Sequence, residues 1–127
     1  MEGKGRITGH TGLLALIGSP VGHSGSPAMY NYSFEKLGLD YAYVAFDIKV
    51  EEVKAALDAM RLFHMRGCNV TMPCKTEAAK YMDELSPAAR IIGAVNTIVN
   101  EDGKLIGHMT DGEGFVGNLR DHGIEID

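Results

Sequence analysis

The chain has 127 residues, of which 45% are hydrophobic and 23% are charged, and its formal charge is -5. This is the length of one ordinary globular domain, and the composition argues against intrinsic disorder. The negative charge argues against a nucleic-acid-binding protein, because nothing neutralises a row of phosphates, but it does not exclude a small anionic substrate.

The first part of the chain predicts a polar leader followed by a buried strand. Residues 1–11 are polar and glycine-rich, so we expect a flexible leader before a domain over residues 12–127. The longest apolar run, Leu13–Ile17, is too short to span a membrane, and no secretory leader precedes it. We therefore expect a cytoplasmic protein. Closed by Gly18 and Pro20, this run predicts a strand covered on both faces.

Helices and strands then alternate. Ser26 as N-cap and Pro27 in the first helical position predict a helix that ends near Leu37, with Gly38 as its stop. The following elements are predicted as a strand over Tyr41–Ile48, an amphipathic helix over residues 51–63 and a strand over Gly67–Thr71.

The second half predicts two short helices, a hairpin and a last helix. The ranges are 76–85 and 87–92 for the short helices, 97–99 and 104–108 for the strands, and 112–122 for the last helix. Ser86 is expected to cap the second short helix, and the linker Asn100–Gly103, which ends in Asp-Gly, is typical of a hairpin turn. Together these elements predict an α/β fold, a three-layer α-β-α arrangement with a mixed, mostly parallel sheet.

Polar side chains gather before the first predicted helix. Ser24 and Ser26 lie in the Gly- and Pro-rich loop Gly18–Pro27, where hydroxyls and free N–H groups at a helix N-terminus could receive a carboxylate. An ordinary turn with a helix cap would show the same residues.

A lysine and an aspartate follow two other predicted strands. Lys75 comes after Asn69–Thr71 and a proline, and Asp111 follows the last predicted strand. Most lysines on a helix are solvated charges, but a side chain just past a strand end enters a crevice. A lysine and a carboxylate there can exchange a proton with a substrate hydroxyl and orient it. We therefore predict that Lys75 and Asp111 face each other across one cavity beside the two serines.

Three further features predict neither a cofactor nor a metal site in this chain. Gly112–Gly117 has the spacing of a dinucleotide fingerprint, but Asp111 and Glu113 would place negative charge against a pyrophosphate. The five histidines lack a metal-ligand spacing, and Cys68 and Cys74 are expected to be reduced thiols.

Four linked segments resemble the N-terminal substrate-binding domain of shikimate dehydrogenases, including the related quinate/shikimate enzymes. These segments are Gly18–Asn31, Asn69–Lys75, Gly93–Thr97, and Thr110–Gly112 with Gly114 and Phe115. Gly25, Tyr30 and Met109 differ from the residues common in that family, but none of these differences removes a catalytic group.

The resemblance implies the NADP-dependent, reversible reduction of 3-dehydroshikimate to shikimate in aromatic amino acid biosynthesis. It implies a substrate carboxylate held by Ser24 and Ser26, and a catalytic pair of Lys75 and Asp111 in which Lys75 relays the proton. The implied substrate-binding residues are Ser24, Ser26, Asn69, Thr71, Lys75, Asn96 and Asp111.

The family continues into a Rossmann domain that binds NADP, and this chain stops at Asp127, about where that domain should begin. We therefore expect a substrate-binding half that has negligible turnover by itself. The expected partner is shikimate or 3-dehydroshikimate, with no nucleic acid or membrane, and a bared apolar surface could let the fragment self-associate. A non-catalytic small-acid-binding module and a quinate-preferring dehydrogenase remain alternatives, and the use of NAD instead of NADP stays open.

Overall fold

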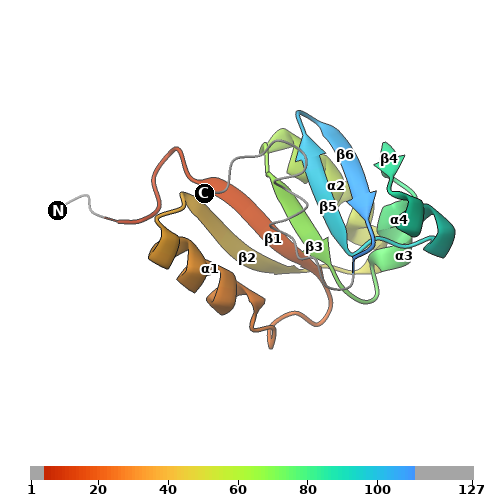
Figure 1. Cartoon of the computed structure of the whole chain (residues 1–127). Helices are drawn as coiled ribbons and strands as arrows, with labels where there is room; N and C mark the ends of the chain where they lie inside the picture. The colour runs from red at the N-terminus through yellow and green to blue at the C-terminus, as the bar shows by residue number, and fades with distance from the viewer. Residues whose placement is uncertain (1–4, 111–127) are drawn as a thin grey trace.

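The buried strand predicted near the start of the chain is the second strand from one edge of the sheet (Figure 1). The computed structural model describes residues 5–110, and within them the sheet has the order β2-β1-β3-β5-β6-β4. The strands are β1 (Gly12–Gly18), β2 (Tyr41–Asp47), β3 (Gly67–Val70), β4 (Glu84–Leu85), β5 (Thr97–Glu101) and β6 (Lys104–His108). The pairs β1–β2, β1–β3 and β4–β6 are parallel, whereas β3–β5 and β5–β6 are antiparallel.

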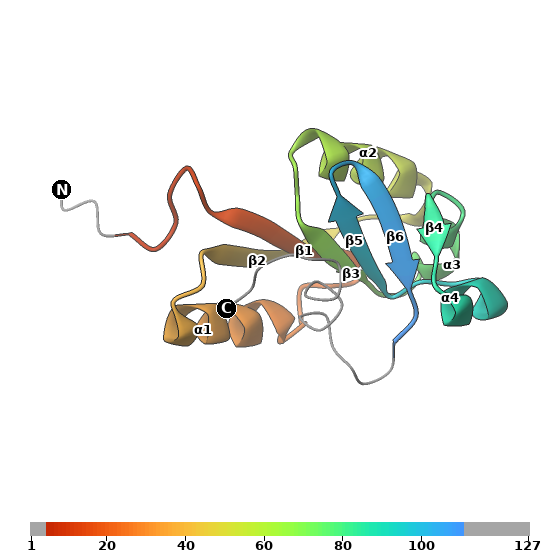
Figure 2. The same cartoon turned by 45° about the horizontal axis from the view of Figure 1, so that its top comes forward.

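Helices cover both faces of this sheet, as Figure 2 shows for α1 and α2. The helices are α1 (Ser26–Leu37), the 3-10 turn η1 (Val50–Glu52), α2 (Val53–Leu62), α3 (Lys75–Ala79) and α4 (Pro87–Ile92). Side chains of a strand alternate between its faces, so β1 contributes to two apolar cores. Leu14 and Leu16 pack with Phe34 of α1, while Ala15 and Ile17 pack with the apolar side of α2. The predicted three-layer α/β fold is therefore confirmed.

The start of α1 differs from the prediction by one residue. Gly25 is the N-cap and Ser26 is the first helical residue, so the assignment of Ser26 as the cap was wrong. The reason is local: the Ser26 N–H donates to the Ser24 hydroxyl oxygen at 3.1 Å, and the turn is closed before the helix begins. The end at Gly38, whose φ is 70°, is as predicted.

The helix predicted over residues 76–85 was wrong beyond Ala79. The chain leaves α3 and forms β4, because its backbone pairs with β6 instead of continuing the helix. The Asp83 N–H donates to Leu105 O at 2.8 Å, and the Ser86 N–H donates to Gly107 O at 2.8 Å. Ser86 then caps α4 as predicted, since its Oγ accepts from the Ala89 N–H at 3.2 Å.

The late hairpin forms where it was predicted, although β5 runs two residues further than expected. Its turn residues Asp102 and Gly103 both have positive φ, 54° and 96°, which is the backbone of the tight turn that Asp-Gly favours. The buried Asn100 closes the turn with its Oδ1, which accepts from the Gly103 N–H at 2.8 Å. Its Nδ2 donates to Met65 O at 2.8 Å and so ties the hairpin to the end of α2.

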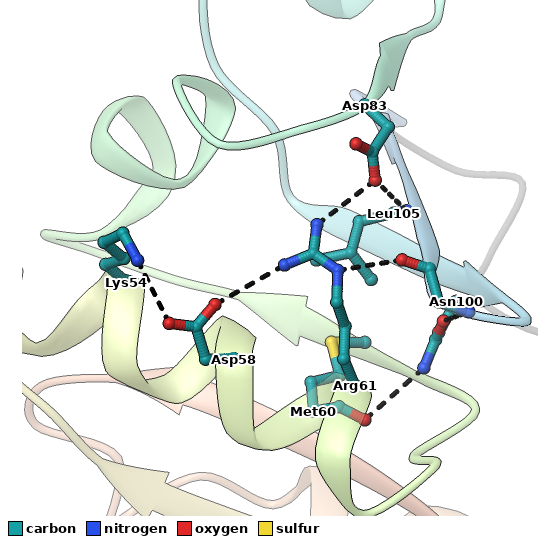
Figure 3. A network of polar contacts seen from close by, with 8 residues as sticks. Lys54, Asp58, Met60, Arg61, Asp83, Asn100 and Leu105 are labelled. Carbon is teal, nitrogen blue, oxygen red and sulfur yellow. Dashed lines mark hydrogen bonds and ion pairs between the residues drawn. The ribbon is translucent and has the colours of Figure 1, made fainter.

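A charged network on the surface ties α2 to the same hairpin (Figure 3). Arg61 lies between Asp58 at 3.6 Å and Asp83 at 3.1 Å, and its Nε donates to Gly103 O at 2.8 Å. Asp83 also accepts from the Leu105 N–H at 2.7 Å. The network therefore fixes β4, β6 and α2 relative to one another.

Within residues 5–110, none of the helices has the length and apolar character that crossing a membrane requires. Cys68 and Cys74 are buried free thiols, and burial raises the pKa of Cys68 to about 12. The helix predicted over residues 112–122 and the Gly112–Gly117 segment lie outside the described residues.

Candidate functional site

The predicted site residues that the structure describes lie along one side of the sheet, the side formed by strand ends and not by an outer strand. This side is called the edge below. At this edge β1 and β3 end and the antiparallel β5 begins (Figure 1). The six residues are Ser24, Ser26, Asn69, Thr71, Lys75 and Asn96, and each is half-buried. The seventh predicted residue, Asp111, lies outside the described residues. Three separate segments of the chain thus place polar side chains at a single edge.

The loops after β1 and β3 are in direct contact at this edge. Gly18 has a φ of 150°, and a Cβ at this position would lie 2.3 Å from Thr71 Cγ2 and 2.9 Å from Met72 O. The Ser19 N–H donates to Met72 O, and the Thr71 N–H donates to Ile17 O, both at 2.9 Å. Only a glycine allows this approach, so Gly18 brings the loop of the two serines beside the segment that leads to the lysine.

The two serines are joined to each other. Ser24 Oγ accepts from the Ser26 N–H at 3.1 Å, which leaves the hydroxyl hydrogen of Ser24 free to donate to an anion. Pro27, the second residue of α1, has no N–H. A carboxylate receptor at this point would therefore use the serine hydroxyls more than the backbone donors that the sequence suggested.

A network of side-chain hydrogen bonds crosses the edge from β2 to β5. The Tyr43 hydroxyl donates to Asn69 Oδ1 at 2.8 Å. Asn69 Nδ2 donates to Thr97 Oγ1 at 3.4 Å, and Thr97 Oγ1 donates to Asn96 Oδ1 at 3.1 Å. This network connects two of the predicted site residues, Asn69 and Asn96, through Thr97, and it adds Tyr43 at its other end.

Asn96 extends this network to the residue before Asp111. Its Oδ1 accepts from the Thr110 N–H at 3.0 Å, and its Nδ2 donates to Thr110 O. The Asn96 N–H in turn donates to His108 O at 2.9 Å. Thr110 is therefore held at the same edge of the sheet as the predicted substrate-binding residues.

Lys75 is the first residue of α3 and is less exposed than Lys80, which follows the same helix. It is half-buried, and its carbonyl accepts from the Val95 N–H at 3.1 Å, which ties it to the segment carrying Asn96. Five residues later, just past the end of α3, Lys80 is exposed and forms an ion pair with Glu77 at 3.0 Å. The structure thus places Lys75 next to the segment that carries Asn96.

Sequence reasoning gave no role in the site to Tyr43, Thr97 or Asn31, although Thr97 and Asn31 lie in the segments that carry the family resemblance. Thr97 is a polar residue that is only 1% exposed. Asn31 lies in the middle of α1, where asparagine is unfavourable, and that was a signal available in the sequence. Its side chain holds both backbone groups of Tyr43, donating to Tyr43 O at 2.8 Å and accepting from the Tyr43 N–H at 2.9 Å.

A cavity of about 430 Å³ lies at the opposite ends of the strands, near the start of β1 and the hairpin turn, and contains none of the six predicted residues. Its lining includes His10, Thr11, Phe63, His64, Arg66 and Asp102. Among residues 5–110, no group of three His, Cys, Asp or Glu side chains is placed to hold a metal ion. The hydrogen-bonded edge, rather than this cavity, therefore carries the candidate chemistry.

Comparison with known proteins gives a family match and close relatives. The family model of the shikimate dehydrogenase substrate binding domain matches residues 16–98. The chain is 53% identical over 121 residues to the shikimate dehydrogenase (NADP(+)) of Listeria monocytogenes and 52% identical over 123 residues to that of Streptococcus uberis. Each match covers 95% of this chain and 42% of the relative, so the chain spans about two fifths of the length of these curated relatives.

Solved structures with the same fold include enzymes for two different substrates. A crystal structure of shikimate 5-dehydrogenase from Listeria monocytogenes in complex with shikimate and NAD matches with a TM-score of 0.83 and 52% identity, over 95% of this chain and 42% of that one. The ligand-free 5-ketofructose reductase of a Gluconobacter strain matches with a TM-score of 0.80 and 31% identity, over 90% and 41%.

Proposed function

Because this chain belongs to the family of shikimate dehydrogenase substrate-binding domains, we propose that it forms the substrate-binding part of an NADP-dependent shikimate dehydrogenase. The proposed reaction converts shikimate and NADP+ reversibly into 3-dehydroshikimate, NADPH and a proton. The observation that carries the proposal is the hydrogen-bonded network from Tyr43 through Asn69 to Asn96, because it holds two of the expected polyol-binding groups together at one edge.

In this proposal the serines hold the carboxylate of the substrate. Ser24 donates its free hydroxyl hydrogen to one carboxylate oxygen, and the Ser26 hydroxyl donates to the other. Asn69, Thr71 and Asn96 then contact the ring oxygens. A polyol bound by this many directed donors is held in one orientation, which is what selective proton transfer requires.

Lys75 and Asp111 are proposed as the catalytic pair. During oxidation of shikimate, Lys75 takes the proton of the reacting hydroxyl, and during reduction it returns that proton to the new alcohol oxygen. Asp111 would orient the hydroxyl between them. The half-buried position of Lys75 and its link to Val95 support this role, and Thr110, one residue before Asp111, is held by Asn96 at the same edge.

Residues 5–110 do not fit the pyrophosphate of a dinucleotide. The connection from β1 to α1 is the segment where a nucleotide-binding turn would lie, but the Ser26 N–H there is taken by Ser24 and Pro27 has no N–H. We therefore propose that NADP binds outside these residues. When bound, its nicotinamide exchanges a hydride with the substrate carbon, while this chain binds the substrate, orients it and moves the proton.

A second candidate function is the reduction of a keto sugar, since the 5-ketofructose reductase shares the fold at 31% identity. The 52% identity with the shikimate-bound enzyme favours shikimate. None of the relatives reported above is a quinate dehydrogenase or a non-catalytic module.

The test measures reduction of NADP+ or NAD+ by shikimate and by quinate, and oxidation of NADPH or NADH by 5-ketofructose, using the full-length polypeptide encoded by the gene. We expect turnover with shikimate and NADP+, and a fall in kcat of about 10²-fold or more in Lys75→Ala. Lys80→Ala is the matched control, because Lys80 is an exposed lysine of the same segment with an ion pair of its own. Activity with 5-ketofructose alone would reject the proposed substrate, and unchanged turnover in Lys75→Ala would reject the proposed base.

A further inference from the structure

Tyr43 contacts Asn69, one of the proposed substrate-binding residues, but is not itself proposed to bind the substrate. Its hydroxyl donates to Asn69 Oδ1 at 2.8 Å. It is a core residue, only 1% exposed, and its ring stacks on Tyr30 with centroids 4.7 Å apart. Asn31 holds both of its backbone groups. Contacts made by its ring, its backbone and its hydroxyl therefore fix the position of the Tyr43 side chain.

The directions of the hydrogen bonds between Asn96 and Tyr43 follow from the backbone of Thr110 at the far end of this network. The backbone N–H of Thr110 can only donate and its carbonyl can only accept, so Asn96 must turn Oδ1 toward the N–H and Nδ2 toward the carbonyl. The single hydroxyl hydrogen of Thr97 is then given to Asn96 Oδ1. Thr97 can therefore only accept from Asn69, and the amide of Asn69 turns Nδ2 toward it.

The same logic reaches Tyr43. With Nδ2 of Asn69 directed at Thr97, its Oδ1 faces Tyr43, so the phenol must be the donor in that bond. Burial raises the pKa of the Tyr43 hydroxyl, with smaller contributions from Tyr30 and Cys68, while the Ser26 side chain acts in the opposite direction. Tyr43 thus keeps its proton and remains a donor at physiological pH.

We propose that Tyr43 is a positioning residue that fixes the Asn69 amide as a hydrogen-bond donor toward the bound substrate. Asn69 has two Nδ2 hydrogens, and with one given to Thr97 the other is presented to the ligand. The substrate atom at this point must then be an oxygen that accepts, such as a hydroxyl, carbonyl or carboxylate oxygen. This inference rests on the proposed function, because it assigns a polarity to one of the proposed shikimate contacts.

The experiment removes only the phenolic oxygen, in Tyr43→Phe, and combines it with Asn69→Ala in a double-mutant cycle. Shikimate affinity is measured by calorimetry on the full-length polypeptide, with thermal unfolding as a check that each variant is folded. We expect Tyr43→Phe to weaken binding about tenfold, because Asn69 Oδ1 loses its donor and the amide is free to turn. In the Asn69→Ala background the same substitution should have little further effect, since its target is gone.

A second readout needs no ligand. The side-chain amide resonances of Asn69 are assigned as the pair that disappears in Asn69→Ala, and they should move in Tyr43→Phe. Tyr41→Phe is the matched control and should leave them in place. It lies on the same face of β2, and its ring packs on Phe34 instead.

The possible failures are distinguishable. A wild-type protein that binds no shikimate would reject the proposed function and this inference with it. A protein that binds shikimate but keeps the Asn69 resonances unmoved in Tyr43→Phe would overturn the role of Tyr43 alone. Equal losses of affinity from Tyr43→Phe in the wild-type and Asn69→Ala backgrounds would do the same, since they would show that Tyr43 acts through packing.

Discussion

Replacing Asn100 by alanine should cost more stability than its place beside a hairpin turn suggests. The side chain is 8% exposed and makes two hydrogen bonds of 2.8 Å, one to Met65 O and one from the Gly103 N–H. Its longer bond to Met60 O, at 3.4 Å, matters less, because that carbonyl also accepts from the Met65 N–H at 3.0 Å. Asn100→Ala therefore leaves the buried Met65 carbonyl without this donor and unties the hairpin from α2.

The magnitude follows from these contacts. Two hydrogen bonds contribute about 1 kcal/mol each, and an unpaired buried carbonyl costs about 1 kcal/mol or more, so the expected loss is about 3 kcal/mol. That is a large part of the roughly 5–15 kcal/mol that stabilises an ordinary domain. With an m-value of about 2 kcal/mol/M, the midpoint of urea unfolding should fall by about 1.5 M.

Equilibrium unfolding in urea, followed by circular dichroism, measures this loss. Lys54→Ala is a suitable control, because Lys54 forms an exposed ion pair with Asp58 in the network of Figure 3 and should change stability by less than about 0.5 kcal/mol. A loss below about 1 kcal/mol in Asn100→Ala, with an unchanged m-value, would refute the assignment of these hydrogen bonds as stabilising.

Three other substitutions have defined outcomes. Gly18→Ala should destabilise the protein by about 2 kcal/mol or more in urea and weaken shikimate binding, because the new Cβ would lie 2.3 Å from Thr71 Cγ2; wild-type affinity would contradict this. The Leu105 N–H holds the pKa of Asp83 below its ordinary value, so Asp83 stabilises the fold above about pH 4 and loses this effect as the pH falls through its lowered pKa. Asp83→Asn should therefore be less stable than wild type near pH 7 and approach it in acid, and a deficit that persists in acid would argue for a packing effect. Ser24→Ala should raise the KM for shikimate about tenfold with a smaller change in kcat, and an unchanged KM would remove Ser24 from the carboxylate site.

Most of the fold could be predicted, because its elements carry local signals. The apolar run of β1, the Pro27 start and Gly38 stop of α1, and the Asp-Gly turn each depend on a few neighbouring residues. The segment from Lys80 to Leu85 was mispredicted because its pairing is not local. Asp83 meets Leu105, which is 22 positions away, and no helical pattern in the segment reveals that partner.

The candidate site was predictable to the extent that its residues mark the ends of strands and the start of a helix. Tyr43 and Thr97 could not be found in this way, because their roles depend on hydrogen bonds between residues 26 and 28 positions apart. In the sequence Tyr43 is one of several aromatic residues in its strand. Only the folded structure shows that its hydroxyl contacts Asn69. The placement of Asp111 opposite Lys75 stays a prediction.

The hydrogen bonds along the outer side of β2, the first strand of the sheet, affect the solubility of the protein. The Asn31 side chain occupies the N–H and carbonyl of Tyr43, an Arg6 guanidinium nitrogen donates to Tyr41 O, and the Tyr41 N–H donates to Leu39 O. Another polypeptide would have to displace these groups before it could pair with β2 as an additional strand. The Asn31 and Arg6 side chains therefore protect the start of β2 from intermolecular strand pairing, which can lead to fibrils.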